Sequence, residues 1–590
     1  MKQLATFLSV MLVAGCGVSA DLDSVSHVQM TTQVDDWRDE IIYQLMVDRF
    51  ADGDARNDFR INPTAMARYH GGDWQGVIDH LDYVESLGVT ALWISPIVRN
   101  VDTDAGVDGY HGYWAQDFEK LNPHFGDLAT LRRLVQECHR RDIKVIVDIV
   151  TNHVGQLFYY DINMNGQPDE NVYGSGTTSP LSRTTEYDPD YDPRGIQSFT
   201  SLGEAGRSPI VFLNMPAIFR VMPESPVFQR PESYNRRGRI TDYNIREQVL
   251  YGDFPGGLKD LRTEDADVRE ALTSIFTRWV LDTDIDGFRI DTLKHVEYEF
   301  WEYFCAQIRQ RVAAAGKHNF FMFGEAFDGD DEFGGTFTAP GRLDSIFYFA
   351  HKFQVFDDVF RRGGPTSKIE ALYSQRDAHY GHTAQPDGID VPPRDALVSF
   401  LDNHDVPRFL YDVPGGNGPQ ALRAALGYLL TMDGIPCLYY GTEQEFAGGN
   451  DPANREDLWN TGYATDGETF RWVARLTRIR RGYEALRRGA YAIRWSTDRV
   501  ADEQDAGVIA FERTLGDQYA LVVVNAQGRK SSETAFGSAA MTVTAPSGTT
   551  LVDVLTDDRL TVGAGGSLTV RVDPYQTRVL VPESQLVPGL

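Results

Sequence analysis

The feature that most constrains the fold is a regular alternation of short apolar runs with amphipathic stretches of helical period. Eight runs are rich in β-branched and aromatic residues, and helical stretches lie between them. Strands that alternate with helices in this way pair in parallel, and eight such units favour an α/β fold, a closed (β/α)8 TIM barrel. The predicted strands are residues 41–47, 89–95, 143–150, 287–291, 320–326, 343–349, 397–405 and 435–441.

This alternation is interrupted once, and it ends before the chain does. Residues 152–255 show little helical period and much Gly, Pro, Asp and Tyr, so a segment of this length after the third strand indicates an inserted domain. The last hundred or so residues contain short strands separated by turn residues, which is typical of an antiparallel β-sandwich. We predict a barrel of residues 37–151 and 256–485, an inserted domain of residues 152–255 and a C-terminal sandwich of residues 486–590.

The N-terminus has the layout of an export signal. Lys2 precedes an apolar stretch over residues 4–13 that is too short for a permanent membrane span. The sequence VAGC, which ends at Cys16, resembles a bacterial lipobox and implies cleavage before Cys16 and acylation of its thiol. An ordinary signal peptide cleaved nearby is the alternative. We expect a signal peptide (1–15), a flexible tether (16–36), and a lipid anchor in a bacterial membrane, at the cell surface or the periplasmic face.

Composition narrows the possible partners. The formal net charge is −29, and so acidic a surface repels phosphate backbones, so we expect no nucleic-acid binding. The four cysteines have no metal-like spacing, and three remain if Cys16 is lipidated, so no disulfide framework is expected. The sequence gives no indication of the oligomeric state.

Charged and titratable residues gather where four of the predicted strands end. Barrels of this type carry their active groups at the C-terminal ends of the strands. A single acidic residue or histidine at a strand end is usually a cap or a salt-bridge partner, but four such ends in one barrel indicate a catalytic mouth. These residues are Asp148, Asn152 and His153 after the third strand, Arg289, Asp291, Lys294 and His295 after the fourth, Glu325 after the fifth, and His404 and Asp405 after the seventh.

Strand alternation suggests roles for two of these carboxylates. Side chains two positions apart share a face, so Arg289 lies beside Asp291, which we expect to stay ionised. Glu325 shares a face with Phe321 and Phe323, and these apolar neighbours are expected to raise its pKa so that it holds a proton near neutral pH. An ionised carboxylate opposite a protonated one is the arrangement that a glycosidase needs.

The ordered set DIVTNH, GFRIDTLKH, FMFGEAF and FLDNHD resembles the four signature regions of the α-amylase family, glycoside hydrolase family 13. The resemblance extends from about Trp37 to the C-terminus. It implies the (β/α)8 barrel, an inserted domain B after the third strand and a β-sandwich domain C. It also implies hydrolysis of α-1,4-glucosidic bonds in starch or malto-oligosaccharides with retained configuration. Together with the lipobox, it suggests a lipid-anchored bacterial member.

The resemblance implies roles for individual residues. Asp291 would be the nucleophile, Glu325 the general acid and base, and Asp405 the group that binds sugar hydroxyls and favours an oxocarbenium-like ring. Other residues would bind the substrate, with Arg289 orienting Asp291 and Tyr113 stacking on the sugar. The full substrate-binding set is Tyr113, His111, His153, Arg289, Lys294, His295, His404, Asp451 and Arg455.

The resemblance also implies bound Ca²⁺, and oxygen-rich clusters suit that ion. One family site would use the side chains of Asp52, Asp54, Asn57, Asp58 and Asp73 with the Gly71 carbonyl, and a second would use Asn152, Asp260 and the His295 carbonyl. A third cluster has the D-x-N-x-N-G spacing of an EF-hand-like loop, although its twelfth position is Val172; a plain Asx-rich turn is the alternative. Its ligands would be Asp161, Asn163, Asn165 and Asp169.

The motifs are also compatible with functions other than starch hydrolysis. Thr292 and the Lys294-His295 pair resemble members that act on α-1,4 bonds, and residues 256–262 lack the QPDLN stretch of α-1,6-acting relatives. A 4-α-glucanotransferase or a cyclodextrin-acting or maltogenic enzyme would carry the same motifs. A non-catalytic glycan-binding surface protein is less favoured, because all three carboxylates are present.

Overall fold

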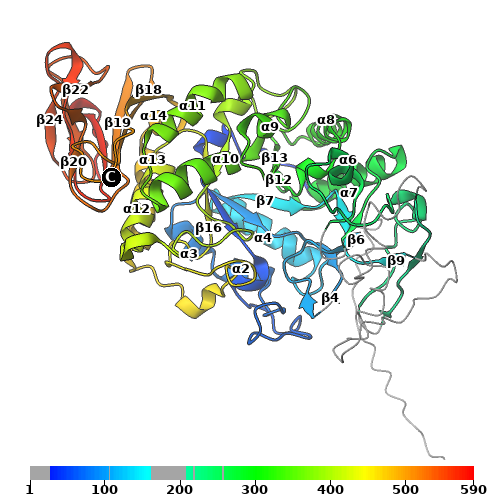
Figure 1. Cartoon of the computed structure of the whole chain (residues 1–590). Helices are drawn as coiled ribbons and strands as arrows, with labels where there is room; N and C mark the ends of the chain where they lie inside the picture. The colour runs from blue at the N-terminus through cyan, green and yellow to red at the C-terminus, as the bar shows by residue number, and fades with distance from the viewer. Residues whose placement is uncertain (1–26, 105, 161–206, 217–218, 255–257) are drawn as a thin grey trace, which may run out of the picture.

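The computed structural model describes residues 27–104, 106–160, 207–216, 219–254 and 258–590. Its centre is a closed barrel of eight parallel strands (Figure 1), and each predicted strand coincides with one of them, so the predicted (β/α)8 fold is confirmed. In their order around the barrel the strands are β1 (Ile42–Leu45), β2 (Ala91–Ile94), β7 (Lys144–Ile149), β12 (Gly287–Ile290), β13 (Phe321–Glu325), β14 (Ser345–Phe347), β15 (Val398–Phe400) and β16 (Ile435–Tyr439), which pairs back with β1.

Aromatic side chains fill the interior of the barrel. Trp93 of β2 meets Phe323 edge-on at 5.6 Å between ring centroids, and Phe347 stacks on Phe400 at 3.6 Å. Because side chains alternate along a strand, Glu325 shares the inward face of Phe323. The parallel register pairs Phe323 with Arg289 of β12, so Arg289 also faces inward. Inward alternation therefore brings these two polar side chains to the C-terminal end of a hydrophobic core.

Helices cover the outside of the barrel, and α4 (Leu128–Arg140) shows how the sequence specifies them. Asp127 caps its N-terminus by accepting a hydrogen bond from the Thr130 backbone NH, and its apolar side chains are buried, namely Leu128, Leu131, Leu134, Val135 and Cys138. No helix in the described ranges is both long and apolar enough to span a bilayer. Besides α4, the barrel part contains α1 (Val47–Phe50), α2 (Trp74–Asp79), α3 (Leu81–Ser86), α7 (Ala266–Thr283), the 3-10 helix η7 (Leu293–His295), α8 (Tyr298–Ala314), α9 (Asp331–Thr336), α10 (Phe349–His351), the π-helix η8 (Lys352–Arg361), α11 (Ser367–His379), α12 (Gly418–Leu429), α13 (Glu468–Gly482) and α14 (Glu484–Arg488).

Short strand pairs cover one side of the barrel mouth. In the inserted segment, β8 (His153–Val154) pairs with β11 (Lys259–Asp260), and β9 (Phe158–Tyr160) pairs with β10 (Ile210–Phe212) beside α6 (Arg246–Tyr251). Earlier in the chain, β3 (Val98–Asn100) pairs with β6 (Ala115–Leu121), and β4 (Thr103–Asp104) with β5 (Val107–Asp108). The expected calcium ligands Asp161, Asn163, Asn165 and Asp169 lie outside the described residues.

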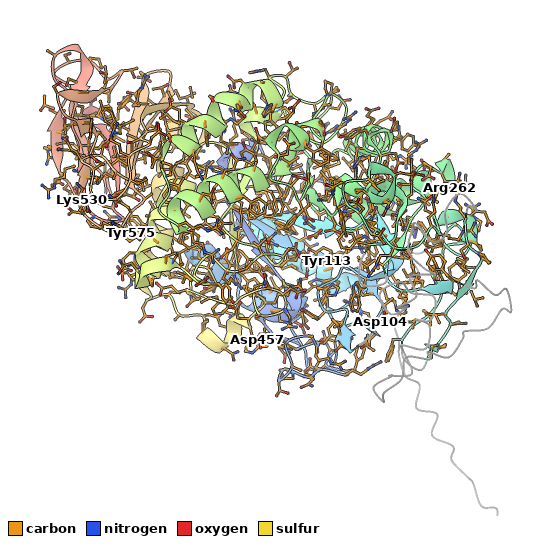
Figure 2. The ribbon with its side chains drawn as sticks, in the orientation of Figure 1. Asp104, Tyr113, Arg262, Asp457, Lys530 and Tyr575 are labelled. Carbon is orange, nitrogen blue, oxygen red and sulfur yellow. The ribbon has the colours of Figure 1, made fainter. Side chains whose placement is uncertain are left out.

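The C-terminal part is an antiparallel β domain, as predicted, placed to one side of the barrel (Figures 1 and 2), where Lys530 and Tyr575 mark it and Tyr113 marks the barrel. Its main sheet has the order β17 (Ala490–Trp495), β18 (Val508–Leu515), β19 (Gln518–Asn525), β27 (Thr577–Pro582), β23 (Thr550–Asp553) and β24 (Arg559–Thr561). Smaller sheets are formed by β20 (Ser532–Glu533) with β26 (Arg571–Val572), and by β21 (Ala535–Phe536), β22 (Ala539–Thr542) and β25 (Ser567–Leu568).

Residues 27–36, which we call the strap, lie against the end of the barrel where the strands begin. The backbone NH and Oγ1 of Thr31 donate to Asp284 at 3.0 and 2.5 Å, just before β12, and Asn319 Nδ2 donates to the Val34 carbonyl at 2.9 Å, just before β13. The expectation of a flexible tether over residues 16–36 is therefore wrong for the strap, because polar groups distant in sequence hold it.

Candidate active site

Arg289 binds three carboxylates at the mouth of the barrel. Its Nη1 donates to Asp148 at 3.0 and 3.1 Å and to Asp291 at 2.9 Å, and its Nη2 donates to Glu325 at 2.6 Å. Arg289 is fully buried. One buried guanidinium cannot neutralise three carboxylates, so electrostatics favours a proton on one of them. The cluster therefore disfavours the simultaneous ionisation of all three carboxylates.

The backbone after β12 places Asp291 in this cluster. The Asp291 NH donates to the Ile149 carbonyl of β7 at 2.9 Å, which continues the strand pairing by one residue. Thr292 then has a φ of 51°, which is costly for a β-branched residue and turns the chain sharply into η7. Gly324 makes room for this turn, because a Cβ there would lie 2.6 Å from Leu293 Cδ2.

Burial and Arg289 together set the acidity of the carboxylates. Burial raises the pKa of Asp148 to about 6 against the attraction of Arg289. Burial also raises the pKa of Asp291 well above its usual value; Arg289 opposes this rise and the neighbouring Glu325 carboxylate adds to it. The expectation that Asp291 stays ionised beside Arg289 remains a prediction: Arg289 favours the charged form, whereas burial and the Glu325 carboxylate oppose it.

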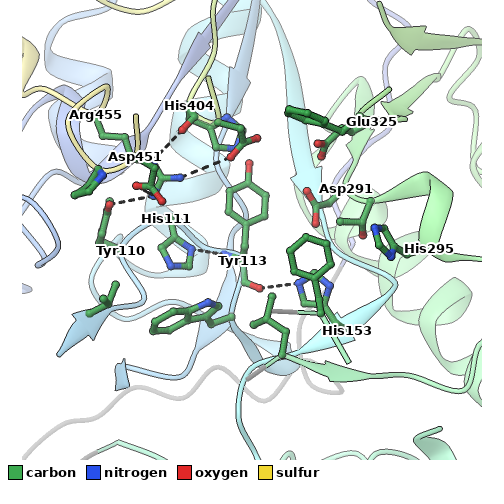
Figure 3. A pocket seen from close by; sticks show the side chains of 18 of the residues that line it. Tyr110, His111, Tyr113, His153, Asp291, His295, Glu325, His404, Asp451 and Arg455 are labelled. Atoms are coloured by element: carbon green, nitrogen blue, oxygen red, sulfur yellow. Dashed lines mark hydrogen bonds and ion pairs between the residues drawn. The ribbon is translucent and has the colours of Figure 1, made fainter. Parts of the chain in front are cut away.

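The predicted histidines surround Tyr113 (Figure 3). The Tyr113 hydroxyl donates to Asp148 at 2.7 Å, and its ring stacks on His404 at 5.1 Å between centroids. The Tyr113 backbone NH donates to His111 at 3.1 Å, and its carbonyl accepts from His153 at 3.2 Å. Burial lowers the pKa of His153 to about 4 and those of His111 and His404 well below the usual value. These rings are therefore neutral hydrogen-bonding groups near pH 7.

A second group of expected residues lies on the opposite wall of the mouth. His404 lies 3.1 Å from Asp405, and Arg455 donates to the His404 carbonyl at 3.2 Å. The guanidinium of Arg455 pairs with Asp451 at 2.8 Å and lies 3.7 Å from Asp405. This network joins the loop after β15 to the loop after β16.

The structure adds site residues to which the sequence analysis gave no role. Gln44 lies 2.8 Å from His404 Nδ1, Tyr110 accepts from Arg455 at 3.0 Å, and Trp93 donates to Asp148 at 3.1 Å. No sequence pattern pointed to a role for Gln44, Tyr110 or Trp93. Asp148, the partner of Trp93, was recognisable as a site residue, because it ends the predicted third strand among other polar residues.

Lys294 and His295 form the third wall. Lys294 Nζ donates to the Phe327 carbonyl at 2.7 Å and so ties η7 to the loop after β13. The ring of His295 hydrogen-bonds to the Val249 carbonyl of α6 at 3.0 Å, which links the inserted segment to the barrel.

These walls enclose a cavity of about 590 Å³. All three expected catalytic carboxylates line it, and so do all the expected substrate-binding residues except Arg289, which is buried beside it. Figure 3 shows Asp291 and Glu325 on one side and Asp451 and Arg455 on the other. Trp114, Tyr243, Phe254 and Phe327 add aromatic surface. A cavity with carboxylates at one point and both aromatic and polar walls suits a polyhydroxylated, ring-shaped substrate.

The first set of expected calcium ligands also lies together. Asn57 donates to Asp73 at 3.0 Å, while Asn57 Oδ1 and Asp58 Oδ1 are buried without a hydrogen-bond partner. Burial raises the pKa of Asp52 and Asp58, and nearby carboxylates raise each further. A Cβ on Gly71 would lie 2.9 Å from Asp58 Oδ1, so the Gly71 backbone adjoins the cluster. Unpaired buried oxygen atoms with uncompensated charge fit a hard cation.

Asp54 of the first set and the ligands of the second set fit a calcium ion less well. Arg56 binds both oxygens of Asp54 at 2.7 Å, so this carboxylate is engaged elsewhere. At the second site Asp260 is buried with Oδ1 unpartnered, and burial raises its pKa well above the usual value. The Asn152 carbonyl accepts a hydrogen bond from the NH of Leu261, the residue that follows Asp260. Within the described ranges no three or more His, Cys, Asp or Glu side chains by themselves form a metal site, so amide and backbone oxygens would have to contribute.

Comparison with known proteins decides the family. A sequence model of the α-amylase catalytic domain matches residues 44–474, more than half of the chain. The chain belongs to the α-amylase family. A model of α-amylase domain C matches residues 503–589, so both parts of this α-amylase family member have their counterparts.

This α-amylase family member has bacterial and yeast relatives. It is 32% identical over 578 residues to the beta/alpha-amylase of Paenibacillus polymyxa. This match covers 95% of this chain but only 39% of the length of that protein. It is 31% identical over 559 residues to alpha-amylase 2 of Schwanniomyces occidentalis, covering 93% and 91% of the two chains. It is 28% identical over 587 residues to the cyclomaltodextrin glucanotransferase of Thermoanaerobacterium thermosulfurigenes, covering 96% and 70%.

Among solved structures, the alpha-amylase of Geobacillus thermoleovorans complexed with acarbose superposes with a TM-score of 0.69 at 27% identity. The match covers 92% of this chain and 98% of that one.

Proposed function

We propose that this protein is a retaining glycoside hydrolase that cleaves α-1,4-glucosidic bonds in starch or malto-oligosaccharides. The observation that carries the proposal is the convergence of Asp291 and Glu325 on one guanidinium. Retaining glycosidases hold their two carboxyl groups about 5 Å apart, whereas inverting enzymes separate them by about 6.5–9.5 Å to admit a water. Two carboxylates that share Arg289 suit the shorter spacing.

In the first step Glu325 gives its proton to the glycosidic oxygen while an Asp291 oxygen attacks the anomeric carbon. The carbon–oxygen bond to the leaving sugar breaks, and an ester bond to Asp291 forms in its place. Arg289, which donates to Glu325 at 2.6 Å, stabilises the carboxylate that this transfer leaves on Glu325. Asp405 and the neutral His404 hold the sugar hydroxyls and favour the distorted ring.

In the second step the Glu325 carboxylate takes a proton from water, whose oxygen attacks the anomeric carbon and releases Asp291. Two inversions at one carbon retain its configuration. His111 and His153, which are neutral and buried, can donate or accept hydrogen bonds to the sugar without adding charge.

The test is reducing-sugar release from soluble starch. Asp291→Ala and Glu325→Gln are expected to lower kcat by at least about 10⁴-fold, because each removes a group that the chemical step needs. Asp466→Asn, at an exposed position, is the matched control and is expected to keep the parent rate. NMR of the first product is expected to show the α-anomer. Release of the β-anomer first, or starch hydrolysis by both variants at the parent rate, contradicts the proposal.

Transfer of the same intermediate to a sugar hydroxyl is a second candidate function. Tyr243 and Phe254 line the cavity beside His295, and Phe327 lines it too; such aromatic surface can hold a sugar acceptor in place of water. A timed product profile from maltoheptaose separates the two. Hydrolysis gives only shorter chains, whereas transfer gives early products longer than the substrate, or rings.

Bound Ca²⁺ is part of the proposal. Asp52, Asn57, Asp58 and Asp73 with the Gly71 carbonyl would hold one ion beside α2, and Asn152 and Asp260 with the His295 carbonyl would hold another between the inserted domain and the barrel. The ions would neutralise carboxylates of which Asp73 and Asp260 are buried, and so stabilise the fold. We expect a chelator to lower the melting temperature of the parent, and Asp58→Asn to reduce that drop. An unchanged melting temperature would contradict this part.

Export and lipid anchoring through Cys16 complete the proposal. The support is the lipobox-like VAGC sequence after a short apolar stretch. Expression in a bacterium with labelled palmitate is expected to label the parent but not Cys16→Ser, and fractionation is expected to place the parent with the membranes.

A further inference from the structure

An exposed tyrosine outside the cavity packs on the loop that carries Asp451 and Arg455. Tyr411 is 45% exposed, and its ring packs against Gly449, two residues before Asp451. A Cβ added at Gly449 would lie 3.0 Å from Tyr411 Cε2, so the missing side chain is what allows the ring to sit there. The ring thus borders the loop that carries the end of the cavity.

The backbone beneath this ring is held firmly to the cavity wall. The Arg408 NH donates to the Gly448 carbonyl at 3.0 Å, and the side chain of Glu456 accepts from Arg408 Nε at 3.0 Å and from the Gly448 NH at 2.7 Å. The Tyr411 NH donates to the Arg408 carbonyl at 3.0 Å, and the Tyr411 carbonyl accepts from Arg361 of η8. The segment after Asp405 and the segment before Arg455 are therefore joined into one support.

A single exposed aromatic residue needs no function, but two features distinguish this one. First, the two segments that support its ring are parts of the loops that place Asp405 and Asp451 in the cavity. Second, its hydroxyl has no hydrogen-bond partner among the residues that the structure describes, although many tyrosine hydroxyls in this chain are paired. The side chain of Tyr411 therefore presents an apolar ring face and an unpaired hydroxyl to a ligand that binds from solvent.

We propose that Tyr411 is an outer substrate-binding residue that packs against a glucose unit beyond those held by Asp451 and Arg455, and so favours long α-glucans over short ones. The inference rests on the proposed function. A pyranose ring presents C–H groups on its faces and hydroxyls at its rim, which match the ring and the hydroxyl of a tyrosine. Because the backbone is already fixed, binding would order little more than the glucan itself.

The test compares kcat/KM for maltotriose and maltoheptaose. We expect Tyr411→Ala to lower kcat/KM for maltoheptaose by about three- to tenfold, mainly through KM, and to leave maltotriose within about twofold. Tyr411→Phe keeps the ring and is expected to keep most of the preference. Phe536→Ala, at a 39% exposed aromatic of the C-terminal domain, is the matched control and is expected to change neither substrate. An equal loss for both substrates, or no loss for maltoheptaose, overturns the inference.

Calorimetry separates this inference from the proposed function. In a Glu325→Gln background, Tyr411→Ala is expected to weaken maltoheptaose binding by the same factor. If the parent hydrolyses no α-glucan but this difference in binding appears, the proposed function fails and the outer binding residue stands. If the parent hydrolyses starch and Tyr411→Ala changes neither kinetics nor binding, only the inference fails.

Discussion

At the residue scale, Arg289 determines how the candidate site works. Its planar fork reaches Asp148, Asp291 and Glu325 at once from two nitrogen atoms, whereas a lysine would present all its donors from a single atom. We expect Arg289→Lys to lower kcat on starch by at least about 100-fold, because the carboxylates lose their shared partner. Weaker attraction raises the pKa of Asp291 further, so the acid limb of the kcat/KM profile is expected to move to higher pH. Arg559→Lys, in an exposed ion pair, is the control. An unshifted acid limb would contradict this role.

Sequence reasoning reached the composition of this cluster but not its electrostatics. The two-residue spacing correctly placed Arg289 and Asp291 on one face, and Glu325 above Phe323. It did not reveal that Arg289 reaches across to β13 and β7, because those contacts depend on the curvature of the closed barrel. The raised pKa of Asp291 follows mainly from its burial, with a further contribution from Glu325 on β13, and neither can be predicted from neighbours within one strand.

At the element scale, strands and helices with a clear period were predictable, whereas the strap was not. The strap has few large apolar residues, and its partners Asp282, Asp284 and Asn319 lie some 250 or more residues away. No local pattern encodes such contacts. The expected first calcium cluster differs, because its contacts are local: the spacing located Asp52 and Asp58, but it did not reveal that Arg56, two residues after Asp54, pairs with that carboxylate.

The strap gives a test of its own. Thr31→Val removes the hydroxyl that donates to the buried Asp284, which also accepts from Lys317 Nζ, so we expect the free energy of unfolding to fall by about 1–2 kcal/mol. Urea denaturation measures this. The activity of the folded enzyme is expected to stay unchanged, because the strap lies where the strands begin and the cavity lies where they end. Thr64→Val, whose hydroxyl is bound only to Asn62 on the surface, is the control. Equal stability of Thr31→Val and Thr64→Val would contradict the role of the strap.

At the scale of the whole molecule, buried polar groups join the barrel to the C-terminal domain. Arg513 of β18 donates to the carbonyls of Thr431 and Leu486 at 3.1 and 2.7 Å. Tyr373 of α11 stacks on Tyr491 of β17 at 4.4 Å between ring centroids. The sequence predicted both parts but nothing of this contact, since it pairs isolated polar residues from elements with unrelated patterns. The two parts therefore depend on each other for the satisfaction of buried groups.

Asp433 lies at this junction, and its ionisation gives a prediction about pH. Its carboxylate accepts from Tyr373 at 2.8 Å and pairs with the buried Arg376. Burial disfavours the charge, but Arg376 outweighs that cost and lowers the pKa of Asp433 from 3.8 to about 2. A carboxyl whose pKa is lowered by folding adds stability above its unfolded value and loses it as pH falls through its folded value. The contribution is thus complete above about pH 4–5 and declines toward pH 2.

Asp433→Asn removes this charge and leaves Arg376 buried without its anion. We expect the free energy of unfolding at pH 7 to fall by about 3–5 kcal/mol, the usual cost of breaking a buried pair. The difference from the parent is expected to hold from pH 7 to pH 5 and to shrink at pH 3, where the Asp433 carboxylate of the unfolded parent takes up a proton and that of the folded parent does not. Urea titrations at these pH values measure it, with exposed Asp466→Asn as the control. A difference that grew toward pH 3 would mean that Asp433 does not stabilise the junction as an anion.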